Sequence, residues 1–107
     1  MEIIAGAGVF VGAGEPHWAE QFRVPDLSCG TYSIPAGGVD DQSPHTEDEI
    51  YVCTGGRAVL RTPSGDAAIV PGVVVFVPAH EEHRFVEVAE DLSLFVFFAP
   101  AEGTRIS

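Results

Sequence analysis

Both the fold and the candidate site follow from residues 37–56, which read GGVDDQSPHTEDEIYVCTGG. A glycine pair stands at each end, and residues 49–53 include several strong β-formers. Side chains four residues apart point to the same face of a pleated strand, so His45 and Glu49 should lie together. An imidazole and a carboxylate on one face are two metal ligands that need a third.

The third ligand is expected in residues 72–85, which read GVVVFVPAHEEHRF. An apolar strand runs to Pro78, and a short polar loop then leads to His83. Two imidazoles and one carboxylate provide three protein ligands and leave positions open for water or substrate.

These two stretches resemble the two sequence motifs of the cupin superfamily, and with the segment between them they span about half of the chain. The first motif is a Gly, five residues, His, one residue, His, three or four residues, Glu, six residues and Gly. This chain matches it at Gly37, His45, Glu49 and Gly56, and has Ser43 in the place of the first His.

The second cupin motif is a Gly, five residues, Pro, one residue, Gly, two residues, His, three residues and Asn. This chain matches it at Gly72, Pro78 and His83, with His80 and Glu87 at the positions of the second Gly and the Asn. We interpret His80 as a residue of the rim. Two partial motifs in the right order are more specific than either one alone.

The resemblance implies an all-β fold, the cupin-type antiparallel β-barrel, also called a double-stranded β-helix or jelly roll. It also implies a divalent metal ion held by His45, Glu49 and His83. The donor set does not choose among Fe, Mn, Ni, Co and Zn. Tyr51 and Phe85 share the strand parity of Glu49 and His83, so we expect them in a pocket wall or in ordinary core packing.

Ser43 is the main departure from the cupin pattern, because most metal-binding cupins supply three His and one Glu. The first position is then either vacant or filled by another side chain. Gln42 is a candidate fourth ligand through its amide oxygen, or else a pocket amide. Asp40, Asp41 and Glu47 are expected to be solvated acids over the barrel mouth.

The strand pattern supports the all-β prediction without the motifs. Strands are expected at residues 27–34, 49–53, 57–62, 67–70, 73–77, 83–88 and 92–99, with residues 54–56 as a hairpin turn. The short spacing between Gly and Pro breaks is typical of a sandwich or barrel. Residues 16–21 favour a helical turn, with His17 and Trp18 in surface or packing roles, and the glycine-rich residues 6–12 favour a short strand.

The length of 107 residues predicts one domain, 1–107, with an N-terminal strand and loop segment at 1–25 and a barrel core at 26–100. The 16 acidic and 5 basic residues give a net charge of -11, which argues against nucleic acid and anionic membrane as partners. No charged leader precedes the apolar N-terminus, so we expect a cytoplasmic protein.

Two strands, residues 73–77 and 92–99, are apolar on both faces. A strand with one wet face would alternate, so a second surface should cover the outer side. We expect a homodimer; the alternative is that residues 3–11 fold back over that face.

Two functions fit these features. The first is a metal-dependent enzyme, such as a dioxygenase or an isomerase, acting on a small organic substrate inside the barrel. The second is a non-enzymatic module that binds a metal or a small metabolite. The fold does not separate the two.

Overall fold

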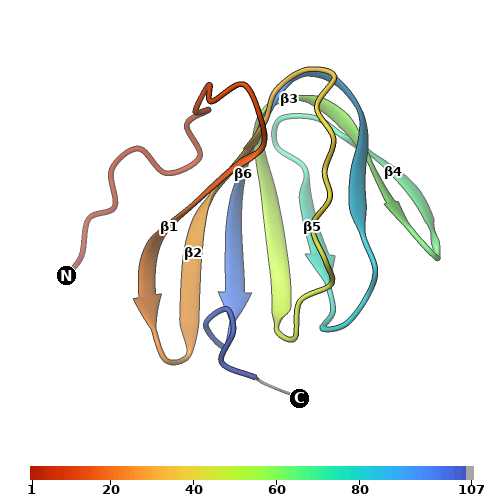
Figure 1. Cartoon of the computed structure of the whole chain (residues 1–107). Coiled ribbons are helices and arrows are strands. Elements are labelled where there is room, and N and C mark those ends of the chain that lie inside the picture. Colours follow the sequence, from red (N-terminus) through yellow and green to blue (C-terminus); the bar gives the residue numbers. More distant parts are fainter. Residues whose placement is uncertain (106–107) are drawn as a thin grey trace.

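Six antiparallel strands form one strongly curved sheet in a computed structural model that describes residues 1–105 (Figure 1). The strands are β1 (His17–Val24), β2 (Leu27–Ile34), β3 (Asp48–Thr62), β4 (Gly65–Ile69), β5 (Val74–Val77) and β6 (Arg84–Ala99). No helix occurs among these described residues, and none is therefore present there that is long and apolar enough to span a bilayer. The all-β prediction is confirmed, and the architecture is that of a cupin-type jelly roll.

The long strands β3 and β6 are the centre of the sheet and pair along most of their lengths. On its other edge β3 pairs with β5 near its start and with β4 near its end. β2 pairs with the second half of β6, and β1 completes that edge. Because the β3–β6 pair bends, the short strands come to lie across from one another and enclose the core (Figure 1).

The predicted hairpin at residues 54–56 is wrong, because residues 48–62 form one continuous strand. Gly55 and Gly56 lie instead where the register between β3 and β6 shifts. Extra residues in one strand of a pair make a bulge, which bends the strand and increases its twist. In the same way residues 84–88 and 92–99 belong to one strand, β6, and His83 directly precedes it.

The predicted helical turn at residues 16–21 is also wrong. These residues enter β1, whose backbone pairs with β2 from His17 onward, so the sheet begins earlier than residue 26. Tertiary pairing with β2 has overridden a weak local preference, as is common for short segments.

The two faces of the sheet follow the alternation along β6. Leu92, Leu94, Val96 and Phe98 are each at most 2% exposed and point into the core. Phe95 and Phe97 point to the outer face and are half-buried. The prediction that this strand is apolar on both faces is confirmed.

The N-terminal segment crosses part of the outer face, although residues 6–12 do not form the expected strand. The Gly8 N–H donates to Thr31 Oγ1 at 2.8 Å, and the Thr54 hydroxyl donates to the Gly8 carbonyl oxygen at 2.6 Å. The Val11 N–H donates to Ser33 Oγ at 3.0 Å. The segment therefore covers the polar end of this face.

Gly56 should be the least replaceable glycine of the β3 bulge. Its φ is 85°, and a Cβ there would lie 2.1 Å from the Asp91 carbonyl oxygen. Gly37 has a similar φ of 76° but no atom within 4 Å of such a Cβ, so it controls for backbone strain alone. We expect Gly37→Ala to cost about 1 kcal/mol and Gly56→Ala about 3 kcal/mol or more in urea unfolding. Equal losses would contradict this account of the bulge.

Candidate functional site

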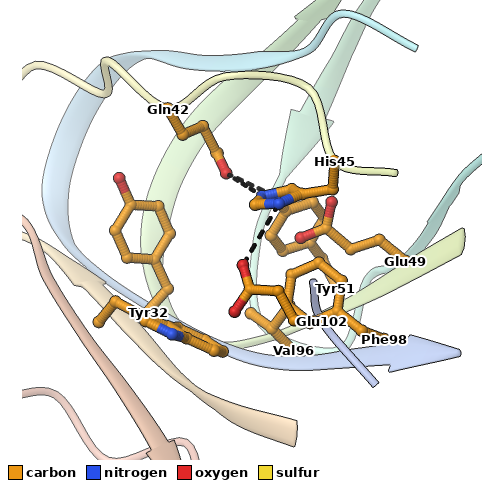
Figure 2. Close-up of a pocket in the computed structure, with 9 residues that line it drawn as sticks. Tyr32, Gln42, His45, Glu49, Tyr51, Val96, Phe98 and Glu102 are labelled. Atoms are coloured by element: carbon orange, nitrogen blue, oxygen red, sulfur yellow. Dashed lines mark hydrogen bonds and ion pairs between the residues drawn. The ribbon is translucent and has the colours of Figure 1, made fainter. Parts of the chain in front are cut away.

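A cavity of about 220 Å³ opens into the barrel (Figure 2). Its apolar wall consists of Trp18 from β1, Tyr32 from β2, and Val96 and Phe98 from β6. Its polar groups are Gln42, His45, Glu49, Tyr51 and Glu102. A mostly apolar concave surface with a few convergent polar groups is the usual form of a small-molecule site.

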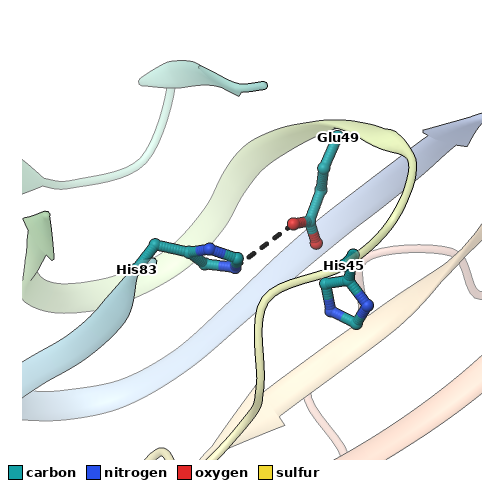
Figure 3. A group of neighbouring side chains, drawn as sticks. All are labelled: His45, Glu49 and His83. Atoms are coloured by element: carbon teal, nitrogen blue, oxygen red, sulfur yellow. Dashed lines mark ion pairs between the residues drawn. The ribbon is translucent and has the colours of Figure 1, made fainter. Parts of the chain in front are cut away.

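His45, Glu49 and His83 come together in one cluster (Figure 3), and His45 and Glu49 also line this cavity. Glu49 lies on β3, His45 lies in the loop before β3, and His83 directly precedes β6. One ligand atom from each residue lies within 4.8 Å of the others, and His83 Nε2 is 3.2 Å from Glu49 Oε1. The barrel therefore brings together the three side chains that the sequence singled out.

The tautomer of His83 follows from its second ring nitrogen. His83 Nδ1 lies 2.9 Å from the Glu81 carbonyl oxygen, which only accepts, so Nδ1 carries a proton. In the neutral ring Nε2 then presents a lone pair toward Glu49. Burial lowers the pKa of His83, but the Glu49 carboxylate and the Glu81 carbonyl outweigh burial, so the pKa is raised overall.

Glu49 has a buried oxygen, Oε1, whose ion-pair partner is the His83 ring at 3.2 Å, and only when that ring is protonated. Glu49 is 2% exposed, and its Oε1 accepts no hydrogen bond among the described residues. A buried carboxylate oxygen without a donor is costly, and such groups usually mark a bound ion, a water or a catalytic role. The donor set of two imidazoles and one carboxylate fits a divalent first-row metal.

Gln42 points its amide oxygen at the same centre. Gln42 Oε1 lies 3.4 Å from His45 Nε2 and accepts a hydrogen bond from the Tyr51 hydroxyl at 3.1 Å. Gln42 Nε2 donates to Asp40 Oδ2 at 2.9 Å, which fixes the orientation of the amide. Ser43 is exposed and does not line the cavity.

Asp40 and Glu47 are both 1% exposed, so the expectation of solvated acids is wrong for them. Asp40 Oδ1 accepts from the Tyr32 hydroxyl at 2.7 Å, and Asp40 Oδ2 accepts from the Phe85 N–H at 2.9 Å. Burial and then this hydrogen bond raise the pKa of Tyr32. These hydrogen bonds offset the free-energy cost of burying the Asp40 carboxylate. No spacing of residues in the sequence predicts them.

Tyr51 and Phe85 have different positions. The Tyr51 hydroxyl lies 2.9 Å from His83 Nε2, at the site itself. Phe85 lies behind Tyr51 in an edge-on contact, with ring centroids 4.9 Å apart, and does not line the cavity. His80 is exposed, and its N–H donates to the His45 carbonyl oxygen.

Two cavity residues escaped the sequence analysis. Trp18 belongs to the region expected to be helical; it pairs with Tyr32 of β2 and lines the cavity beside it, although it is 37% exposed. Glu102 follows the last strand, and its carboxylate lies 3.3 Å from His45 Nδ1 (Figure 2). No sequence signal connects Glu102 to the motifs.

Solved structures with similar architecture agree with the fold. The cupin superfamily protein of Desulfitobacterium hafniense is 16% identical, with a TM-score of 0.70 over 85% of this chain and 83% of its own. Ectoine synthase from P. lautus is 16% identical, with a TM-score of 0.73 over 94% of this chain and 79% of its own. The DMSP lyase DddQ from Ruegeria pomeroyi is 19% identical, with a TM-score of 0.74 over 92% of this chain and 54% of its own.

The fold of this chain is that of solved cupin superfamily and double-stranded β-helix proteins. The chain is similar along most of its length to the uncharacterized protein SCO3923 of Streptomyces coelicolor, with 36% identity over 91 residues, 85% of this chain and 87% of that protein. The glucose-6-phosphate isomerase of Pyrococcus furiosus is 37% identical over 60 residues, which are 51% of this chain and 32% of the isomerase. No family model matches the chain.

Proposed function

We propose that this protein is a metal-dependent enzyme of the oxygenase or isomerase type that acts on a small organic molecule inside the barrel. The observation that carries the proposal is the buried Glu49 Oε1, which accepts no hydrogen bond among the described residues and lies in a cluster with the imidazoles of His45 and His83, next to a cavity. A divalent ion bound there would supply Lewis-acid chemistry or oxygen activation. Fe, Mn, Ni, Co and Zn all accept this donor set.

His45, Glu49 and His83 would hold the metal, and Gln42 would direct an amide oxygen to the fourth position. Tyr51 serves as a neutral hydrogen-bond donor, because burial and the nearby Glu49 carboxylate raise the pKa of its hydroxyl. The wall of Trp18, Val96 and Phe98 excludes water and orients the apolar part of a substrate.

The cavity favours a substrate without a phosphate group. The sequence contains no lysine, and no arginine lines the cavity, whereas Glu49 and Glu102 both do. Phosphate recognition normally uses arginine, lysine or a helix N-terminus. The partial similarity to glucose-6-phosphate isomerases therefore supports metal-assisted carbonyl chemistry more than it supports a sugar phosphate.

His83→Ala should lower the metal content at least tenfold, because it removes one of three protein ligands. The exposed His80 provides the matched control, and His80→Ala should retain the metal. We would measure metal by mass spectrometry in protein from defined medium supplemented with each candidate ion. Oxygen uptake and isomerisation would then be followed with diketones, phenols and thiols.

Equal metal content in the two variants would reject the ligand assignment. Metal bound through His83 without turnover of any substrate would favour the non-enzymatic binding module.

Gln42→Ala should weaken metal binding about tenfold if its amide oxygen completes the metal shell, by analogy with the loss of other supporting groups. Ser43→Ala, the adjacent exposed position, should leave affinity unchanged. Titration of both variants with the same metal, followed by calorimetry, compares them directly. A loss confined to Ser43→Ala would show that the serine oxygen fills the position instead.

We also propose that two copies associate through the outer face of the barrel. Val74 and Phe76 are 61% and 59% exposed. Phe76 also lines a groove together with Leu27, Asp48, Glu49, Ile50, Phe97 and Ala99. The N-terminal segment covers only the polar end of this face, through Gly8. A net charge of -11 on each copy favours a contact through a mostly apolar surface, and in this patch the acids are Asp48 and the buried Glu49.

Phe76→Glu should convert the dimer into a monomer, because it places a charge in an interface that would bury about 800 Å² per partner. Val39→Glu is the matched control, since Val39 is 72% exposed in the loop before the site. Light scattering at micromolar concentration measures the mass. A wild-type mass near the single-chain value of 11.3 kDa would end the dimer proposal.

A further inference from the structure

In the segment after β6, the Glu102 carboxylate lies beside the candidate metal ligand His45. The Glu102 Oε2 atom lies 3.3 Å from His45 Nδ1, and the two side chains are 28% and 21% exposed. An exposed ion pair contributes little, but this pair lines the cavity itself. We propose that Glu102 is a positioning residue that accepts the Nδ1 proton of His45 and so directs His45 Nε2 into the site. The proposal rests on the metal site of the proposed function.

The contacts around the site determine which nitrogen of His45 faces the centre. His45 Nε2 lies 3.4 Å from Gln42 Oε1, which in turn accepts from the Tyr51 hydroxyl. The Tyr51 hydroxyl is 2.9 Å from His83 Nε2, and His83 Nε2 is 3.2 Å from Glu49 Oε1. This chain of contacts places both Nε2 atoms at the centre and both Nδ1 atoms on the outside.

The Nδ1 atoms of both imidazoles have an acceptor next to them, but the two acceptors differ in kind. His83 Nδ1 is held by the carbonyl oxygen of Glu81, two residues away. His45 Nδ1 is held by Glu102, which is distant in sequence. A carboxylate on the second nitrogen of a ligand histidine fixes its tautomer and ring orientation and raises its basicity.

Hydrogen bonds made by the backbone of Glu102 and of the residues that follow it hold this segment in place. The Glu102 N–H donates to Ser28 Oγ at 2.9 Å, and the Glu102 carbonyl accepts from Arg23 Nη2 at 2.7 Å. The buried Glu47 carboxylate accepts from the Gly103 N–H at 3.0 Å and from the Arg105 N–H at 3.1 Å. Burial raises the pKa of Glu47, but the hydrogen bonds from Thr46 and these amides outweigh it, so the pKa is lowered overall.

The alternative arrangement of His45 is electrostatically unfavourable. A proton on Nε2 would donate to the neutral Gln42 Oε1 at 3.4 Å, but the Nδ1 lone pair would then face the charged Glu102 carboxylate at 3.3 Å. Two acceptors at 3.3 Å repel each other, whereas an Nδ1–H donates to the carboxylate. Glu102 therefore selects the tautomer whose Nε2 lone pair is available to a metal.

The test measures the tautomer directly in the metal-free full chain. Protein labelled with ¹⁵N-histidine is observed by NMR at about two pH units above the ordinary imidazole pKa. We expect His45 to carry its proton on Nδ1, with the signal assigned by its loss in His45→Gln. Glu102→Ala should shift His45 to a mixture of tautomers. A proton on Nε2 in the wild-type protein would overturn the proposal without any variant.

Metal affinity provides the second readout. We expect Zn²⁺ or Co²⁺ to bind about 10-fold to 100-fold more weakly to Glu102→Ala, with Glu102→Gln in between. Glu82→Gln is the control, because it removes the same charge from an exposed position beside His83. The backbone amide signals of Gly103 and Arg105 report whether the segment stays docked.

The outcomes separate the two proposals. Unchanged affinity in Glu102→Ala with an unchanged His45 tautomer would overturn the positioning role. Failure of the wild-type protein to bind any metal would overturn the proposed function, while the His45 tautomer would still decide the role of Glu102.

Discussion

The structure depends on the bent pairing of β3 with β6. Hydrogen bonds between these two long strands persist across the bulge at Gly55 and Gly56, so the sheet turns back on itself without being interrupted. The bend places Glu49, at the start of β3, opposite His83, which precedes β6. A straight strand pair would leave these two side chains at opposite ends of an open sheet.

Buried carboxylates distinguish the structural parts of the site from its reactive part. Asp40 and Glu47 are as deeply buried as Glu49, but backbone amides and hydroxyls donate to both of their oxygens. Among the three, Glu49 alone has an oxygen that accepts no hydrogen bond in the part of the chain that the structure describes, and its ion-pair partner, His83, is itself a candidate metal ligand. A fully hydrogen-bonded carboxylate holds loops in place, whereas an incompletely bonded one invites a cation.

These structural carboxylates also explain how residues outside the strands can form a site with a defined geometry. His45 and Gln42 lie in a loop, and Glu102 lies beyond the last strand. Asp40 ties the loop to Tyr32 and to the backbone of Phe85, and Glu47 ties the C-terminal segment to the start of β3. The geometry of the cavity thus depends on side chains that the ligand need not touch.

The sequence alone determined the all-β class, β2, and the three side chains that converge, because periodicity, Gly and Pro breaks and motif spacing are local properties. It did not distinguish a hairpin from a bulge at Gly56, since both use a glycine with positive φ and only the partner strand decides between them. It also missed the place of Trp18 in the cavity wall and the burial of Asp40. The contact between Glu102 and His45 was decided by tertiary structure alone, because it joins segments that no periodic pattern relates and that meet only when the barrel closes.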